Sequence, residues 1–91
     1  MKVTRSKKFK KDFKLAKKQQ KDISHLKEVI EKLSTGKMLP KALNDHQLVG
    51  NLKQYRELHL EPDWLLIYRI DENKDELKLA RLGSHSELYK K

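Results

Sequence analysis

Apolar residues recur along this chain with two different periods, and the change of period separates a helical first part from a strand-rich second part. Phe9, Phe13 and Ala16 fall at helical spacing, which predicts a first helix with Ser6 as its N-cap that runs to about Gln20. A second apolar stripe follows at the same spacing and is formed by Ile23, Leu26, Val29, Ile30 and Leu33. The two stripes predict a pair of helices that each bury one face.

The ends of the second predicted helix are marked by polar residues and a glycine. Asp22 and Ser24 are both suitable N-caps, and either of them could open the helix. Gly36 is a natural C′ residue, because glycine adopts left-handed backbone angles without strain. The segment that follows, residues 37–52, is predicted to be an irregular connection.

The period of the apolar residues changes to two at about Gln54, which predicts strands. The first of these strands carries Tyr55, Glu57, His59 and Glu61 on one face and Arg56, Leu58 and Leu60 on the other. Glu57 and Glu61 are expected to be exposed, where they either order His59 or are simply solvated. Arg56 shares its face with leucines and is expected to donate to a structural ion pair.

The remaining strands follow from turn signals and apolar runs. Pro62 and Asp63 predict a tight turn, and residues 64–70 are nearly continuously apolar, as a central strand is. Residues 76–82 form the last predicted strand, Gly83 allows a sharp exit from it, and residues 2–5 could add a short edge strand. The order β-α-α-β-β-β predicts an α+β fold, in which a helical hairpin packs on a small antiparallel sheet.

Composition adds a strong basic charge to this picture. The chain has 91 residues, enough for one domain (residues 1–91), with 38% charged residues and a net charge of +9. Residues 1–35 hold 12 Lys and Arg against 4 Asp and Glu, so nearly all of the excess lies in the predicted helices. A one-sided excess of this size favours a nucleic acid or an acidic protein as the partner.

Cysteine chemistry is excluded, because the chain contains no cysteine. The basic N-terminus lacks the apolar segment of a secretory signal, and no run reaches the length of a membrane span. These observations predict a cytoplasmic protein with no membrane partner.

The candidate chemistry lies in three histidines, His46, His59 and His85, together with Asp63. Cleavage of RNA by the neighbouring 2′-hydroxyl needs a base and an acid, and imidazole suits both roles because its pKa lies near neutral pH. A carboxylate such as Asp63 can orient an imidazole, hold it protonated or act as the base. This route needs no metal or other cofactor.

Other side chains would bind the RNA. Arg81 could neutralise charge that develops on the phosphate, while Trp64 and Tyr89 offer faces on which a base can stack. Trp64 is more often a core residue than a stacking platform. His25 lies at the edge of a helical stripe and is expected to be structural or merely exposed.

A metal site is the less favoured alternative. A facial triad could be formed by His46 and His59 with Asp63 or His85. The chain carries no compact metal signature such as His-Glu-x-x-His, so the metal-free route is preferred.

Three spaced motifs carry a family resemblance. They are Asp45-His46-x-Leu48-x-Gly50, Tyr55-Arg56-x-x-His59-x-x-Pro62-Asp63-Trp64-Leu65-Leu66-Ile67-Tyr68 and Arg81-x-Gly83-x-His85-x-x-Leu88-Tyr89. In this order, and after a lysine-rich helical hairpin, they resemble the YafQ branch of the RelE/ParE toxin superfamily. The resemblance runs over nearly the full length of the chain.

The resemblance implies a small α+β toxin that cleaves messenger RNA in the ribosomal A site without a metal. It also implies a co-encoded antitoxin, expected to be acidic and partly disordered when free, through which the pair binds operator DNA. Catalytic positions of the family fall on His46, His59, Asp63, His85 and the terminal aromatic Tyr89, and substrate-binding positions fall on Trp64 and Arg81. A catalytically silent nucleic-acid or protein-binding module and a ParE-like gyrase inhibitor remain as alternatives.

Overall fold

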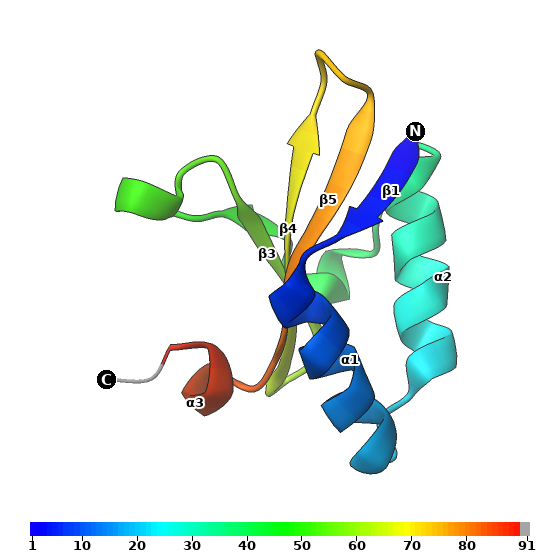
Figure 1. Ribbon diagram of the computed structural model, residues 1–91. Coiled ribbons are helices and arrows are strands. Elements are labelled where there is room, and N and C mark those ends of the chain that lie inside the picture. Colours follow the sequence, from blue (N-terminus) through cyan, green and yellow to red (C-terminus); the bar gives the residue numbers. More distant parts are fainter. Residues whose placement is uncertain (90–91) are drawn as a thin grey trace.

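The sheet of this protein has one face covered by two helices and an opposite face on which the short helix of residues 85–88 lies (Figure 1). The computed structural model describes residues 1–89. Its elements are β1 (Lys2–Arg5), α1 (Lys7–Lys18), α2 (Ile23–Ser34), η1 (Lys41–Leu43), β2 (His46–Gln47), η2 (Gly50–Leu52), β3 (Arg56–Glu61), β4 (Trp64–Asp71), β5 (Glu76–Gly83) and α3 (His85–Leu88). We call the sheet face opposite α1 and α2 the open face.

The predicted α+β class is confirmed, and the predicted elements occur in the expected order with β2 and α3 in addition. The sheet differs from expectation at its two edges. The strand order is β1-β5-β4-β3-β2. The three central strands are antiparallel, as predicted, but β1 pairs with β5 in parallel. Parallel pairing is possible here because the helical hairpin separates β1 from the strands that follow it. At the other edge His46 and Gln47 form β2 against β3, within a segment that was expected to be irregular.

Polar caps set the ends of both long helices. The Ser6 hydroxyl accepts a hydrogen bond from the Phe9 backbone N–H at 2.9 Å, as expected of an N-cap. Asp22, and not Ser24, opens α2, because its carboxylate accepts from the His25 N–H at 3.0 Å. Gly36 has a φ of +72°, which confirms it as the residue that ends this helix.

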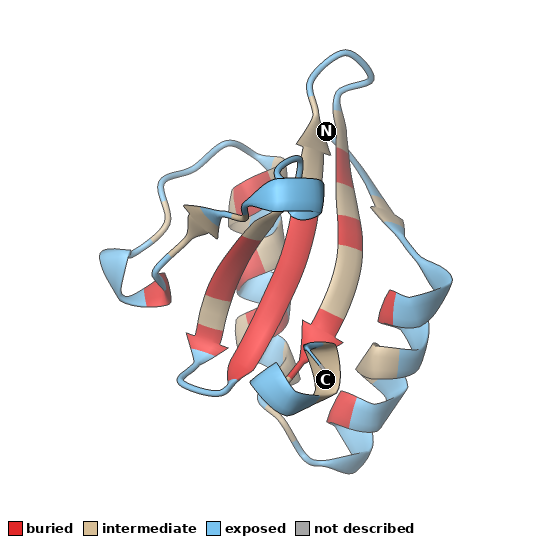
Figure 2. Cartoon of the chain, turned by 90° about the vertical axis from the view of Figure 1, so that its left-hand side faces the viewer, coloured by how far each residue is buried: buried red, intermediate tan, exposed pale blue. Residues whose placement is uncertain are grey.

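The core lies between the helical hairpin and the sheet (Figure 2). Phe9 and Leu26 of the helices pack there with Leu58, Trp64 and Tyr68 of the strands, and each of these side chains is at most 2% exposed. Along β3 the leucines therefore point to the helices, which turns Glu57 and His59 to the open face. No helix among residues 1–89 is long and apolar enough to cross a membrane.

Candidate active site

Three imidazoles from three different segments form a row on the open face. His59 of β3 lies in the middle, with its ring centroid 6.1 Å from that of His46 on β2 and 5.8 Å from that of His85 on α3. The structure therefore brings together the three histidines that the sequence singled out. Such a row can exchange protons with one bound substrate at more than one atom.

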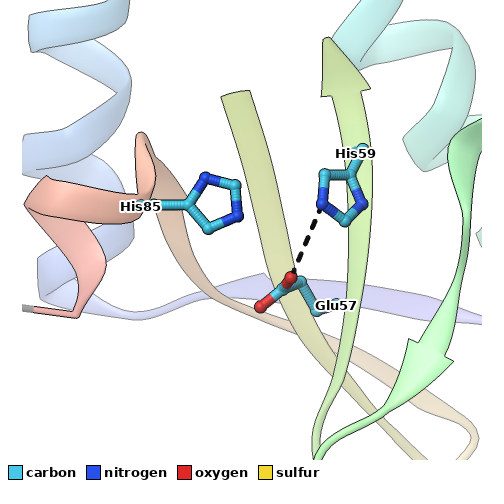
Figure 3. Close-up of side chains that lie close together, drawn as sticks. All are labelled: Glu57, His59 and His85. Atoms are coloured by element: carbon cyan, nitrogen blue, oxygen red, sulfur yellow. Dashed lines mark ion pairs between the residues drawn. The ribbon is translucent and has the colours of Figure 1, made fainter. Parts of the chain in front are cut away.

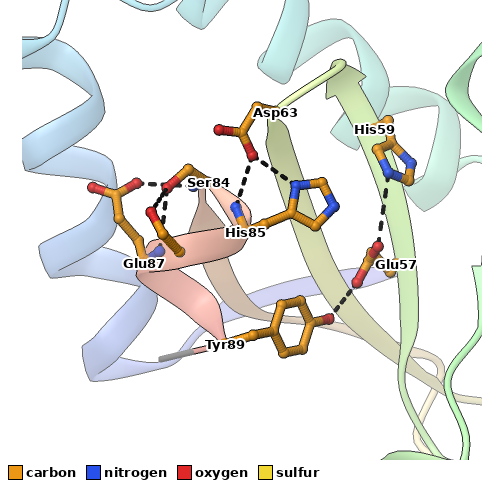
Figure 4. Close-up of polar contacts among 8 residues, drawn as sticks. Glu57, His59, Asp63, Ser84, His85, Glu87 and Tyr89 are labelled. Carbon is orange, nitrogen blue, oxygen red and sulfur yellow. Dashed lines mark hydrogen bonds and ion pairs between the residues drawn. The ribbon is translucent and has the colours of Figure 1, made fainter. Parts of the chain in front are cut away.

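Asp63 fixes the orientation of His85. One oxygen of its carboxylate accepts from the backbone N–H of His85 at 2.9 Å and contacts the ring Nδ1 at 2.6 Å (Figure 4). The backbone N–H and then the ring lower the pKa of Asp63 below its ordinary value. The carboxylate is therefore charged at neutral pH and holds the proton of His85 on Nδ1, which leaves Nε2 for a substrate.

The short helix α3 that carries His85 is built on a capping box. The Ser84 hydroxyl accepts from the Glu87 N–H, and the Glu87 carboxylate accepts from the Ser84 N–H at 2.8 Å. This last bond lowers the pKa of Glu87. Gly83 is needed because a Cβ there would lie 3.1 Å from the Glu87 carboxylate and 3.2 Å from Leu88, so it allows α3 to fold closely against β5.

His46 is positioned by its neighbours in the chain. Asn44 takes left-handed backbone angles, with φ of +49°, and its carbonyl accepts from His46 Nδ1 at 2.8 Å. Asp45 ties this turn to the sheet, because its carboxylate accepts from Arg56 Nε at 2.6 Å and from the Tyr68 hydroxyl. The predicted ion-pair role of Arg56 is thus confirmed, and burial together with Asp45 raises the pKa of Tyr68.

Glu57 is the part of this site that the sequence reasoning missed. It was expected to be exposed, but it is only 5% exposed, and its carboxylate contacts His46, which is paired with it on β2, and the Tyr89 hydroxyl. Its Oε1 lies 3.8 Å from His46 Nε2. The same oxygen lies 3.9 Å from His59 Nε2, and Oε2 accepts from the Tyr89 hydroxyl (Figure 4). Burial and the Glu57 carboxylate raise the pKa of Tyr89, so its phenol stays protonated at neutral pH and acts as a donor.

Two predicted substrate-binding residues have other partners in the structure. Trp64 is 1% exposed and belongs to the core, so its ring has no free face on which a base could stack. Arg81 donates from Nε to the Asp12 carboxylate of α1 at 2.8 Å, and this bond raises the pKa of Arg81. Burial thus contradicts the expected stacking on Trp64, whereas the expected phosphate contact of Arg81, whose side chain is 29% exposed, stays a prediction.

A set of possible metal ligands also lies in the row. Glu57, His59 and His85 each offer one ligand atom, and these atoms lie within 4.8 Å of one another (Figure 3). The set differs from the triads expected from the sequence. It contains Glu57 in place of His46, and Asp63 is not a member because its carboxylate is bonded to His85. Two imidazoles and a carboxylate suit transition metals such as copper or zinc.

The remaining polar candidates lie at the margin of the row. His25 is part of α2, where its N–H contributes to the helix cap, and it is not among the aligned imidazoles. Glu61 is exposed, as expected, and pairs with Lys21 at 3.9 Å.

Comparison with known proteins agrees with this architecture over almost the whole chain. A family model described as "Bacterial toxin of type II toxin-antitoxin system, YafQ" matches residues 1–90. The mRNA interferase toxin YafQ of Escherichia coli K12 is 40% identical over 82 residues, which are 89% of this chain and 87% of the relative.

Solved structures give the same answer. A copper-bound mutant toxin from Helicobacter pylori superposes with a TM-score of 0.92 and 43% identity, covering 98% of this chain and 99% of the other. The E. coli DinJ–YafQ complex contains a chain that matches with a TM-score of 0.86 and 39% identity, covering 96% of each. By sequence and by fold, this chain belongs to the YafQ family of toxins of bacterial type II toxin–antitoxin systems.

Proposed function

We propose that this chain is an mRNA interferase, a ribosome-dependent endoribonuclease that cleaves messenger RNA in the A site by attack of a 2′-hydroxyl. Its relatives in E. coli are named mRNA interferase toxins. The observation that carries the proposal is the row of His46, His59 and His85 with Asp63 at its end. A module that only bound RNA would not need three imidazoles aligned on one open face.

The geometry suggests how protons would move. The Nδ1 atoms of His46 and His85 are each held by an acceptor, the Asn44 carbonyl and the Asp63 carboxylate. Both rings therefore turn Nε2 toward the space along the row, where one can take the 2′ proton and another can protonate the departing 5′ oxygen. General acid and base steps of this kind each contribute on the order of 10²–10⁴-fold to the rate.

The basic surface of α1 supplies the attraction for the ribosome. Seven lysines lie on this helix, and all of them are exposed: Lys7, Lys8, Lys10, Lys11, Lys14, Lys17 and Lys18. Changing several of them to glutamate should weaken ribosome binding and flatten its dependence on salt, because fewer phosphate contacts would release counterions. Unchanged binding by a correctly folded variant would contradict this role.

The same toxin is proposed to be held inactive by a co-encoded antitoxin. E. coli YafQ is found in complex with DinJ in solved structures. For this chain, with a net charge of +9, the complementary partner is an acidic antitoxin that is partly disordered when free. The pair would reach operator DNA only through the antitoxin.

The proposal is tested by inducing the wild-type chain, His85→Ala and His25→Ala in separate cultures and mapping the 5′ ends of cellular transcripts. Wild type and His25→Ala should arrest growth and produce new 5′ ends in register with codons, because His25 lies outside the row. His85→Ala should do neither. Growth arrest that is equal for His85→Ala and wild type, without cleavage, would favour the silent binding module or the gyrase inhibitor instead.

Cleavage is proposed to be independent of metal, and this can be tested separately. Purified toxin and ribosomes carrying messenger RNA should give the same cleavage after the toxin alone has been treated with EDTA and freed of it. Added Cu²⁺ should inhibit, since Glu57, His59 and His85 could bind it and would then be unable to exchange protons. Loss of cleavage after EDTA, with recovery on adding a divalent ion, would refute metal independence.

A further inference from the structure

We propose that Glu57 is a positioning residue, which holds α3 and its catalytic candidate His85 in the row through the hydroxyl of Tyr89. This inference rests on the proposed ribonuclease function, because it assigns a role within the same site. Glu57 itself would not touch the substrate, since it is only 5% exposed and its carboxylate contacts the histidines and Tyr89.

The contacts of Glu57 link all three segments of the site. It sits on β3 directly opposite His46 of β2, and it lies two residues before His59 on the same strand face. Its Oε2 accepts the Tyr89 hydroxyl from a residue 32 positions away, while its Oε1 faces the Nε2 atoms of His46 and His59. No other carboxylate in the described chain contacts two of the three histidines.

The surroundings of Glu57 make a carboxylate an unusual choice for stability alone. The residues across from and beside it on the open face of β4 are Leu65 and Ile67, which are buried and apolar. A carboxylate in such a place is destabilising unless it is paired, and a leucine or methionine would fill the volume without that requirement. A specific partner for the carboxylate is therefore to be expected, and the Tyr89 hydroxyl provides it.

The helix α3 needs this partner because it is too short to be stable by itself. It has four residues, far below the length at which an isolated helix persists in water. Asp63 anchors its first residue, and Tyr89 directly follows its last residue, so the bond to Glu57 anchors the other end (Figure 4). His85 is then fixed from both sides, and release of one end would let its ring move relative to His59.

The two anchors differ in what a single substitution removes. Asp63 bonds directly to His85, so its loss would alter the imidazole as well as the helix. Tyr89→Phe keeps the ring and removes only the hydroxyl that reaches Glu57. Tyr89→Phe therefore tests the placement of α3 without altering the groups bonded to the His85 imidazole.

The experiment compares Tyr89→Phe, Glu57→Gln and the double variant in ribosome-dependent cleavage at varied ribosome concentration. Tyr89→Phe should lower kcat by about 10- to 100-fold with little change in KM, because a small displacement of a reacting group is enough for such a loss. Glu57→Gln keeps an oxygen that can accept the Tyr89 hydroxyl and should retain most of the activity. The double variant should be no worse than Tyr89→Phe alone.

Tyr55→Phe is the matched control, since the Tyr55 hydroxyl has no hydrogen-bond partner among residues 1–89. It should leave kcat unchanged. Unchanged kcat in Tyr89→Phe, or a loss in KM alone, would overturn the proposal, and so would a loss in Glu57→Gln as large as that in Tyr89→Phe. The last result would mean that Glu57 acts by its charge and not by holding Tyr89.

Amide hydrogen exchange gives a second readout that does not depend on activity. Exchange in α3 should become faster in Tyr89→Phe and stay near the wild-type rate in Glu57→Gln and Tyr55→Phe, while exchange in β4 stays unchanged in all three. A wild-type chain that cleaves nothing would refute the proposed function, yet this comparison would still decide whether Glu57 positions α3. Equal exchange rates in α3 across all variants would overturn the positioning role.

Discussion

The link between Asp12 and β5 leads to a quantitative prediction about stability. The Asp12 carboxylate accepts from Arg81 Nε at 2.8 Å, from Arg81 Nη2 at 3.4 Å and from the Leu82 backbone N–H at 2.9 Å. Leu82 is 2% exposed, so Asp12→Ala would leave a buried N–H without an acceptor. An unsatisfied buried donor costs about 1–3 kcal/mol, and the ion pair with Arg81 adds up to about 1 kcal/mol because water reaches the guanidinium.

Asp12→Ala should therefore lower the free energy of unfolding by about 2–3 kcal/mol, which for a domain of this size corresponds to a melting temperature lower by about 10–20 °C. Thermal and urea unfolding followed by circular dichroism would measure both quantities. Asp12→Asn is the matched control, because it keeps an oxygen for the Leu82 N–H and should lose only about 1 kcal/mol.

Arg81→Ala gives the comparison that can refute this reasoning. The Leu82 N–H keeps its acceptor in that variant, so the loss should be about 1 kcal/mol or less, and adding it to Asp12→Ala should change little. An Arg81→Ala loss as large as that of Asp12→Ala would show that the ion pair, and not the buried N–H, dominates. A loss below about 0.5 kcal/mol in Asp12→Ala would show that water or a neighbour replaces the carboxylate.

Three further predictions concern stability and the attachment of the site. Trp64→Ala should lower the free energy of unfolding by about 3–5 kcal/mol, measured in urea, because the ring is 1% exposed; a stable variant that had lost only RNA binding would contradict the core role. Tyr68→Phe should lower the free energy of unfolding by about 1–2 kcal/mol in the same assay, because Asp45 loses a hydrogen-bond donor. It should also make amide exchange in β2 faster, and an unchanged exchange rate would contradict the role of this bond in holding β2. Acid should release α3, since the pKa values of Asp63 and Glu87 are lowered by folding from 3.8 and 4.5. The two carboxylates stabilise α3 fully above pH 4.5, and this stabilisation is lost as the pH falls through their lowered pKa values. The amides of α3 should therefore lose protection from hydrogen exchange below pH 4.5, before the amides of β4 do. Simultaneous loss of protection in α3 and β4 would contradict this prediction.

The helices and central strands could be predicted because their signals are local. Ser6, Asp22 and Gly36 act on the backbone within a few residues, and the leucines of β3 report burial by simple alternation. The three histidines were candidates from their residue type alone, and the spaced motifs indicated that they belong to one site, since each comes from a different segment.

The parts that escaped prediction depend on contacts between distant segments. Glu57 alternates with leucines, which is the pattern of an exposed residue. It is buried in the folded chain, where it contacts β2 and Tyr89, and these contacts cannot be read from the sequence around it. Arg81 carries no local sign of its partner, because Asp12 lies 69 positions earlier on α1. The parallel pairing of β1 is similar, since a four-residue strand does not reveal which strand it will join.

The place of β1 in the sheet also fixes when the toxin can mature during its own synthesis. Within residues 1–89 the strand of residues 2–5 pairs only with residues 76–79, so it has no neighbour in the sheet until β5 has been made. The helical hairpin can form early as the chain emerges, but the sheet closes late, and His85 comes later still. Until His85 has been added, a nascent chain therefore lacks the third imidazole, and the proposed nuclease cannot yet be complete.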